Sequence, residues 1–129
     1  MRLVSGLLIL LSVMIGGARA AEPASQRFVV YFQLWSAALD DTAQAIVDQA
    51  AAVAKATPGT SVRVLGFADP TGSRQANVLL ADLRAQVVVD QLVAGGIGAA
   101  RIHQRSHGPV QFASTSQESR RVEIAVGGR

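Results

Sequence analysis

Hydrophobic and polar residues follow different periods along the chain, and the changes of period divide it into strands and helices. Residues 28–34 form a run of β-branched and aromatic residues that predicts a largely buried strand. Residues 61–67 alternate between apolar and polar, which is typical of a strand near a sheet edge or with one exposed face. Residues 101–106 predict a weaker strand, and residues 120–126 a cleanly alternating one.

Two segments with apolar residues every three or four positions predict helices between these strands. The first helix begins at Asp40 or Asp41, either of which suits an N-cap, and ends before residues 57–59. The second begins near Ser73 and ends at the paired glycines 95–96. The apolar face of the second helix, which is expected to pack on the sheet, consists of Leu80, Leu83, Val87 and Leu92.

The order of elements is therefore strand, helix, strand, helix, strand, strand. Neither an internal repeat nor a proline-rich or serine-rich linker divides them. Alternating strands and helices favour a sheet that contains parallel pairs. The sequence predicts one α+β domain, a two-layer βαβαββ sandwich with a mixed sheet and both helices on one face.

The first 20 residues have the pattern of a secretory signal peptide. Arg2 precedes an apolar stretch at residues 3–15, and small residues follow at Ala18 and Ala20. This stretch is shorter than the ~20 apolar residues that span a bilayer. Cleavage after Ala20 is the favoured expectation, and an uncleaved amino-terminal anchor is the alternative.

Charge and cysteine content narrow the classes of partner. The whole chain carries a net charge of +3, but without residues 1–20 it has ten basic and nine acidic residues, a net charge of +1. This balance does not indicate a nucleic-acid partner, and no transmembrane segment is expected in the mature chain. Because cysteine is absent, disulfides, a thiol nucleophile and a cysteine-linked lipid are excluded. The expected organisation is a leader at 21–26, a domain at 27–126 and a tail at 127–129.

Two opposite charges are predicted to meet at one end of the sheet. Asp69 lies in the loop before the second helix, and Arg84 lies two turns into that helix. Asn77, Ala81, Arg84 and Val88 share a helical stripe displaced from the expected core face, which places Arg84 at a rim. Asp69 and Arg84 would suit a zwitterionic ligand, with the guanidinium holding a carboxylate. The alternative is a structural ion pair between them.

Four segments carry a resemblance to a known family. Residues 77–88 resemble the Asn-x-x-Leu-Ser/Ala-x-x-Arg-Ala-x-x-Val segment of the OmpA-like domain, the peptidoglycan-binding module of outer-membrane protein A, Pal and MotB. Residues 30–36 resemble its opening strand, 62–72 its second strand and binding loop, and 120–124 its last strand. The resemblance covers about residues 27–126.

The resemblance implies a periplasmic domain, associated with peptidoglycan or the outer membrane, that binds without catalysis or a cofactor. Its ligand would be the diaminopimelate residue of the peptidoglycan stem peptide. By position, Asp69 and Arg84 match the family's contacts to the ammonium and carboxylate of that residue, and Asn77 matches a supporting residue. The loop backbone at Thr71 and Gly72 completes the implied binding set.

Departures from the family motifs lie near this expected pocket and leave a second function open. Residues 66–69 read Gly-Phe-Ala-Asp where the family has Gly-His-Thr-Asp, and residues 32–36 lack the family's two carboxylates. The alternative is a degenerate domain that binds an envelope protein through an apolar patch of Phe67, Ala68 and Trp35. Trp35 is otherwise expected to cover the end of the core.

The remaining polar residues do not predict catalysis. His103 and His107 have a spacing that binds zinc on a helix, but on a strand these positions lie ~13 Å apart, so no metal site is expected. Arg101, His103 and Arg105 are expected on one solvated strand face, or alternatively on a face that attracts acidic wall polymers. Motifs for a serine nucleophile or a phosphate-binding glycine loop are absent. An enzyme is therefore not expected.

Overall fold

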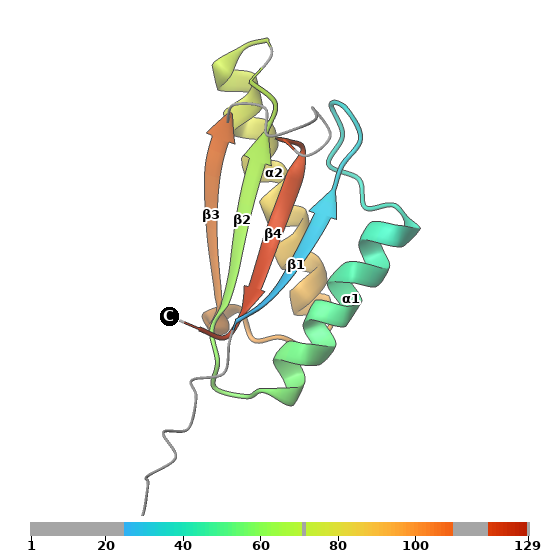
Figure 1. Ribbon diagram of the computed structural model, residues 1–129, viewed down its shortest axis with the longest axis vertical. Helices are drawn as coiled ribbons and strands as arrows, with labels where there is room; N and C mark the ends of the chain where they lie inside the picture. The colour runs from blue at the N-terminus through green and yellow to red at the C-terminus, as the bar shows by residue number, and fades with distance from the viewer. Residues whose placement is uncertain (1–24, 71, 110–118, 129) are drawn as a thin grey trace, which may run out of the picture.

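A computed structural model describes residues 25–70, 72–109 and 119–128 (Figure 1). The expected signal peptide, most of the leader and the last residue lie outside this part. The elements are β1 (Gln26–Tyr31), α1 (Asp41–Ala56), β2 (Val62–Ala68), α2 (Arg74–Ala94), a 3-10 helix η1 (Ala99–Arg101), β3 (Ile102–Pro109) and β4 (Arg121–Val126).

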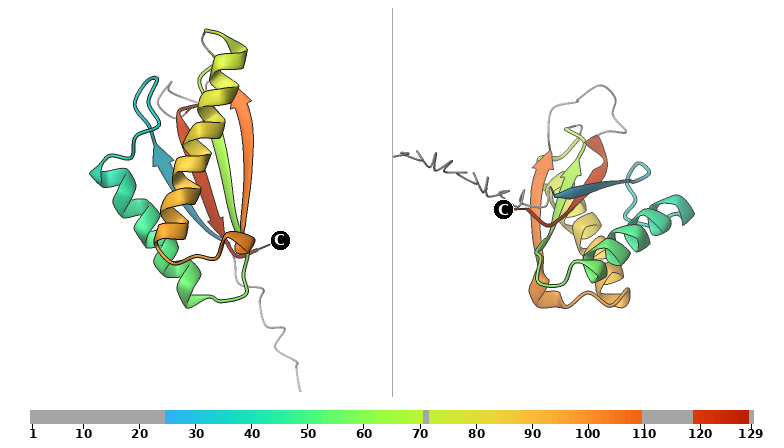
Figure 2. Two further views of the ribbon diagram at one scale, coloured as in Figure 1. Left: turned by 180° about the vertical axis from the view of Figure 1, so that it is seen from behind. Right: turned by 60° about the horizontal axis from the view of Figure 1, so that its bottom comes forward.

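The four strands form one mixed sheet in the order β1-β4-β2-β3. β4 pairs antiparallel with both β1 and β2, whereas β2 and β3 are parallel. Both helices lie on the same face of the sheet (Figures 1 and 2). The predicted two-layer α+β sandwich is confirmed.

The two helices begin and end at the residues that the sequence predicts. Asp40 caps α1 because its Oδ1 accepts a hydrogen bond of 2.7 Å from the amide of Ala43. Ser73 caps α2 in the same way, with its Oγ 3.3 Å from the amide of Ala76. Gly95 ends α2 by donating to the carbonyl of Gln91.

The predicted face of α2 is wrong, because α2 is rotated relative to that prediction. Leu83 is 53% exposed, and Leu80 and Val87 are only half-buried. The stripe that was expected at the rim is instead buried against the sheet. All four of its residues are buried, as are Ala85 and, from the predicted face, Leu92; the four are Asn77, Ala81, Arg84 and Val88.

A close approach of α2 to β2 explains this rotation. A Cβ atom on Gly66 would lie 2.3 Å from the carbonyl oxygen of Ala81 and 3.2 Å from the Cβ of Ala85. The glycine therefore lets the backbones of strand and helix touch, and only small helical residues fit at that contact. The leucines of α2 are too large for this position and lie outside it.

Two strand predictions also change. β2 is an inner strand, so it does not lie at an edge. The other predicted possibility, one exposed face, agrees with its burial, because Val62 and Val64 are buried whereas Arg63 and Leu65 are only half-buried. β1 is an edge strand, and within it only Val30 is fully buried. It ends at Tyr31, before the predicted residue 34, because the chain leaves the sheet there toward α1. The core lies between the sheet and the two helices.

Candidate functional site

A small pocket lies beyond the carboxyl-terminal end of β2, where the β2–α2 loop approaches the β1–α1 loop. Its cavity is about 10 Å³, which is room for about one water molecule. The pocket brings together three of the predicted site residues, Asp69, Asn77 and Arg84. The other lining residues are Leu34, Trp35, Leu80 and Arg120.

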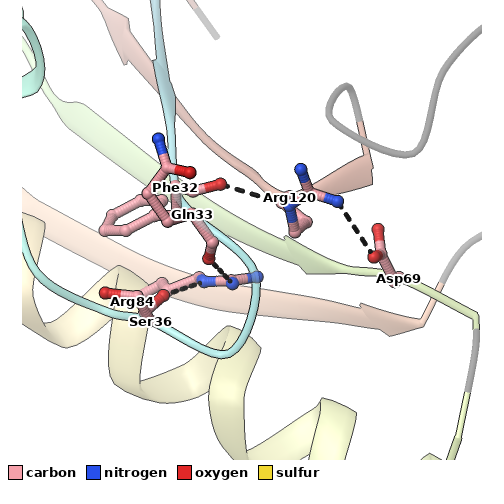
Figure 3. Close-up of polar contacts among 6 residues, drawn as sticks. All are labelled: Phe32, Gln33, Ser36, Asp69, Arg84 and Arg120. Carbon is pink, nitrogen blue, oxygen red and sulfur yellow. Dashed lines mark hydrogen bonds and ion pairs between the residues drawn. The ribbon is translucent and has the colours of Figure 1, made fainter.

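Arg84 is fully buried at the inner side of this pocket. It does not pair with Asp69. Its Nε donates to the carbonyl of Ser36 at 2.7 Å and its Nη2 to the carbonyl of Gln33 at 3.0 Å (Figure 3). The guanidinium also lies 5.3 Å from the ring centroid of Phe32. Arg84 therefore fixes the β1–α1 loop against α2, a role that sequence analysis did not predict.

The charge of Arg84 is only partly compensated. Burial is the largest cause that lowers its pKa to about 10, and the neighbouring cation Arg120 lowers it as well. The negative charge of Asp69 opposes both effects. Arg84 is still protonated at neutral pH, so the pocket contains a buried guanidinium whose charged form is disfavoured.

Asp69 is also buried and pairs with Arg120, the residue just before β4. Its Oδ2 lies 3.3 Å from Nη1 of Arg120, whose Nε donates to the carbonyl of Phe32 at 3.2 Å (Figure 3). The alternative left open by the sequence, an ion pair between Asp69 and Arg84, is therefore wrong, and Asp69 pairs with Arg120 instead. Arg120 joins Asp69 to the end of β1.

Asp69 and Arg84 each have one polar atom whose hydrogen-bonding capacity is not satisfied by the described residues. Oδ1 of Asp69 and Nη1 of Arg84 are buried and have no hydrogen-bond partner within the described ranges. Both side chains line the same cavity. The pocket therefore offers one unpaired anionic acceptor and one unpaired cationic donor, and such buried polar atoms are costly unless a partner satisfies them.

The other predicted site residues have different positions. Asn77 is buried, and its Nδ2 donates to the carbonyl of Ser73 at 3.0 Å, so it fixes the first turn of α2. Gly72 has a φ of +83°, and a Cβ there would lie 3.6 Å from the Trp35 ring. Thr71 lies outside the described residues.

Trp35 does not cover the core, contrary to the prediction. Its side chain is 58% exposed at the mouth of the pocket, and its φ of +53° is uncommon for a residue other than glycine. Phe67 and Ala68 are buried, so these two residues do not form an exposed apolar patch with Trp35. Phe67 instead stacks on His107, with ring centroids 5.3 Å apart, and the guanidinium of Arg121 lies 3.9 Å from its ring.

Two buried or half-buried residues near this site, Arg120 and Ser119, were not among the predicted site residues. The arginines at positions 120 and 121 begin a strand, where side chains alternate between faces, so only one of them can point toward the pocket. Ser119 is fully buried, and its Oγ has no partner in the part of the chain that the structure describes. The alternation of these side chains can be predicted from the sequence, but the sequence does not show that the Asp69 loop lies beside Arg120.

Arg101 is not on the face of β3 with His103 and Arg105. It belongs to η1, and its guanidinium donates to the carbonyls of Ala54, Thr57 and Thr60 at 2.9–3.1 Å. Arg101 therefore holds the carboxyl-terminal end of α1.

The described residues contain neither a metal-binding cluster nor a membrane-spanning helix. Residues 25–70, 72–109 and 119–128 contain no cluster of three or more side chains that could bind a metal ion. The helices of the same described part are too short or too polar to cross a membrane.

Fold and pocket together define an α+β domain with a buried site of both charge signs. The chain belongs to the OmpA family, whose model matches residues 31–124. The family resemblance found in the sequence is thereby confirmed.

Relatives with known names support this assignment. The probable lipoprotein YiaD of Escherichia coli is 35% identical over 103 residues, which are 75% of this chain and 47% of YiaD. The peptidoglycan-binding protein ArfA of Mycobacterium tuberculosis is 36% identical over 87 residues, 63% of this chain and 27% of ArfA. The chain thus spans about half of YiaD and about a quarter of ArfA. The peptidoglycan-associated lipoprotein of Rhizobium meliloti is 32% identical, with coverage of 87% and 71%.

Solved structures show the same fold. The peptidoglycan-associated lipoprotein of Burkholderia pseudomallei is similar with a TM-score of 0.68 and 26% identity, covering 78% of this chain and 90% of that one. The periplasmic domain of Helicobacter pylori MotB is similar with a TM-score of 0.67 and 20% identity, with coverage of 81% and 75%.

Proposed function

We propose that this protein binds peptidoglycan non-covalently in the bacterial cell envelope, through a zwitterionic group of the diaminopimelate residue in the stem peptide. The observation that carries the proposal is the pair of unsatisfied buried atoms in one pocket, Oδ1 of Asp69 and Nη1 of Arg84. Relatives whose names state peptidoglycan binding or association support peptidoglycan as the ligand. The protein would act in the periplasm, at the wall or the outer membrane.

The two atoms suit the two ends of an amino acid group. A ligand ammonium would donate to Oδ1 of Asp69, and a ligand carboxylate would accept from Nη1 of Arg84. Each bond is charge-assisted, and the carboxylate would supply the compensation that the buried guanidinium lacks. The binding requires no nucleophile, acid or base, which fits a non-catalytic role.

Arg84 is preorganised for this contact. Two carbonyl acceptors already hold its Nε and Nη2, so the guanidinium loses little freedom when a ligand binds to Nη1. Arg120 limits the contribution of Asp69, because the ligand ammonium would share the carboxylate with it.

Two side chains of the β1–α1 loop must move before a ligand can enter, while Arg84 keeps its bonds to the backbone of that loop. The cavity of about 10 Å³ is too small for an amino acid group. Leu34 and Trp35 line the pocket and are 57% and 58% exposed, so they can move outward without leaving the core. We infer that Trp35 swings away from Gly72 to admit the ligand.

Co-sedimentation with isolated diaminopimelate-type peptidoglycan tests the proposal. The natural protein should pellet with the wall, and Asp69→Asn and Arg84→Gln variants that remain folded by circular dichroism should stay in solution. Asp82→Asn and Arg74→Gln are matched controls, because both residues are exposed on α2 and neither lines the pocket. Both controls should pellet like the natural protein.

Two outcomes would refute separate parts of the proposal. If the folded natural protein does not pellet, wall binding is wrong. If it pellets equally with a wall in which lysine replaces diaminopimelate, or if free diaminopimelate does not release it, the predicted ligand group is wrong.

A further inference from the structure

Acidic and basic side chains are distributed unequally between the helical layer and the sheet, although the net charge of the chain is small. Acidic side chains are exposed on the helices, whereas the sheet face opposite the helices is basic. The exposed acidic residues of the helices are Asp41, Asp48, Asp82 and Asp90. The basic residues of the open sheet face are Arg27, Arg63, Arg105 and Arg121, with His103 and His107, against the single acidic residue Glu123 in the described part of that face.

Strand register places several of these cations side by side. Arg27 on β1 is opposite Ala125 on β4, Ala125 is opposite Arg63 on β2, and Arg63 is opposite His103 on β3. Because neighbouring strands are ~4.8 Å apart, the backbones at Arg27 and Arg63 lie about 10 Å apart. Arg105 lies in the adjoining row, opposite Leu65.

The small side chain of Ala125 leaves a hollow between these arginines. The cavity is about 430 Å³, a volume within the usual range for small-ligand sites. It lies at the end of the sheet where β2 begins and on the face away from the helices, whereas the Asp69 pocket lies beyond the end of β2. Its polar lining includes Arg27, Arg63 and Arg105.

The lining combines three kinds of contact. The permanently charged cations of the lining are all arginines. Their guanidinium groups bind carboxylate or phosphate with two parallel hydrogen bonds. Ser25, Ser61 and Glu123 add groups that hydrogen-bond to hydroxyls. Leu65 and Ala125 supply an apolar surface between the polar groups.

We propose that this hollow is a second binding site and takes an anionic saccharide chain. Arg27, Arg63, Arg105 and His103 line it together with the two serines, Glu123, Leu65 and Ala125. Carboxylates on the sugars would pair with Arg27 and Arg105, which are exposed. Sugar hydroxyls would bind the serines and Glu123, and the apolar face of a sugar ring would lie on Leu65. Arg63 is anchored to the carbonyl of Gly127 at 3.3 Å and would orient the site.

Other anionic partners fit this surface less well. A polyglutamate chain has neither hydroxyls for the serines and Glu123 nor a ring face for Leu65. An anionic membrane would also engage exposed apolar side chains. The exposed Leu34 and Trp35 line the other pocket instead, beyond the opposite end of β2.

Fluorescence anisotropy with a labelled oligogalacturonate, a carboxylated saccharide, tests the proposal on protein purified from the envelope of expressing cells. The natural protein should bind, and the affinity should fall as salt rises from about 50 to 200 mM, since salt screens exposed charges. Arg27→Gln/Arg105→Gln should weaken binding about tenfold or more, because two charge-assisted contacts are lost. Lys55→Gln/Arg74→Gln has the same net charge but changes the helical side, and it should bind like the natural protein.

Several results would overturn the proposal. These are no binding by the folded natural protein, an equal loss in the two double variants, or tighter binding to polyglutamate or to anionic phospholipid vesicles. Co-sedimentation of the Arg27→Gln/Arg105→Gln variant with peptidoglycan measures, independently, whether the Asp69 pocket still binds the wall. A failure here with normal wall sedimentation would refute only the saccharide site.

Discussion

The contact between Gly66 and α2 allows one substitution to be predicted in detail. In Gly66→Ala the new Cβ would lie 2.3 Å from the carbonyl oxygen of Ala81 and 3.1 Å from its carbonyl carbon. Ordinary contact begins at 3.4 Å, so α2 would have to retreat by about 1 Å. A helical carbonyl cannot rotate away without breaking its own hydrogen bond.

The cost should lie at the upper end of the range for overpacked cores, about 3 kcal/mol. For a domain of this size, that corresponds to a decrease in Tm of about 12–24 °C. The retreat of α2 would also pull Arg84 away from the carbonyls of Gln33 and Ser36. We therefore expect the folded fraction of Gly66→Ala to bind peptidoglycan more weakly.

Thermal and urea unfolding followed by circular dichroism would measure this effect. Gly98→Ala is the matched control, because a Cβ at Gly98 has no neighbour within 4 Å and its φ is −61°. The control should be unchanged or more stable by about 0.4–1 kcal/mol. If Gly66→Ala lowers Tm no more than Gly98→Ala does, the close approach of α2 to β2 is wrong.

Three further substitutions test the other anchoring contacts, each by the same unfolding measurements. Arg101→Met should cost about 2 kcal/mol because it leaves the carbonyls at the end of α1 without their donor, and no change would contradict that role. Asp40→Ala should cost about 1 kcal/mol through loss of the N-cap, whereas Asp41→Ala should cost less. Arg84→Met should cost about 2–3 kcal/mol, since loss of two charge-assisted bonds outweighs relief of the buried charge, and equal or greater stability would refute this balance.

Helix boundaries could be predicted because their causes are local. Asp40, Ser73 and Gly95 act through hydrogen bonds to residues of the same helix, so the sequence contains both partners. The packed face of α2 could not be predicted in this way. The apolar residues of α2 alone predict that its leucines face the sheet. The helix instead turns the face of Ala81 toward the sheet, because α2 approaches β2 closely at Gly66, which belongs to another element.

The predicted site was similarly incomplete. The sequence placed Asp69 and Arg84 at one end of the sheet, and the structure brings both to one pocket. The partners of each depend on long-range packing, since Arg120 is 51 residues from Asp69 and Gln33 is 51 residues from Arg84. The exposure of Trp35 likewise depends on the path of its loop, which neither its apolar character nor its neighbours in sequence determine.

The position of β4 also determines when the sheet can form. β4 is the last of the described strands, yet it lies between β1 and β2 and is the only described strand that pairs with β1. A chain that lacks β4 can pair β2 with β3, but its first strand has no neighbour in the sheet. These contacts join distant parts of the chain, and contacts of this kind slow the folding of a domain. A chain that ends before β4 therefore cannot complete this sheet, however well its helices form.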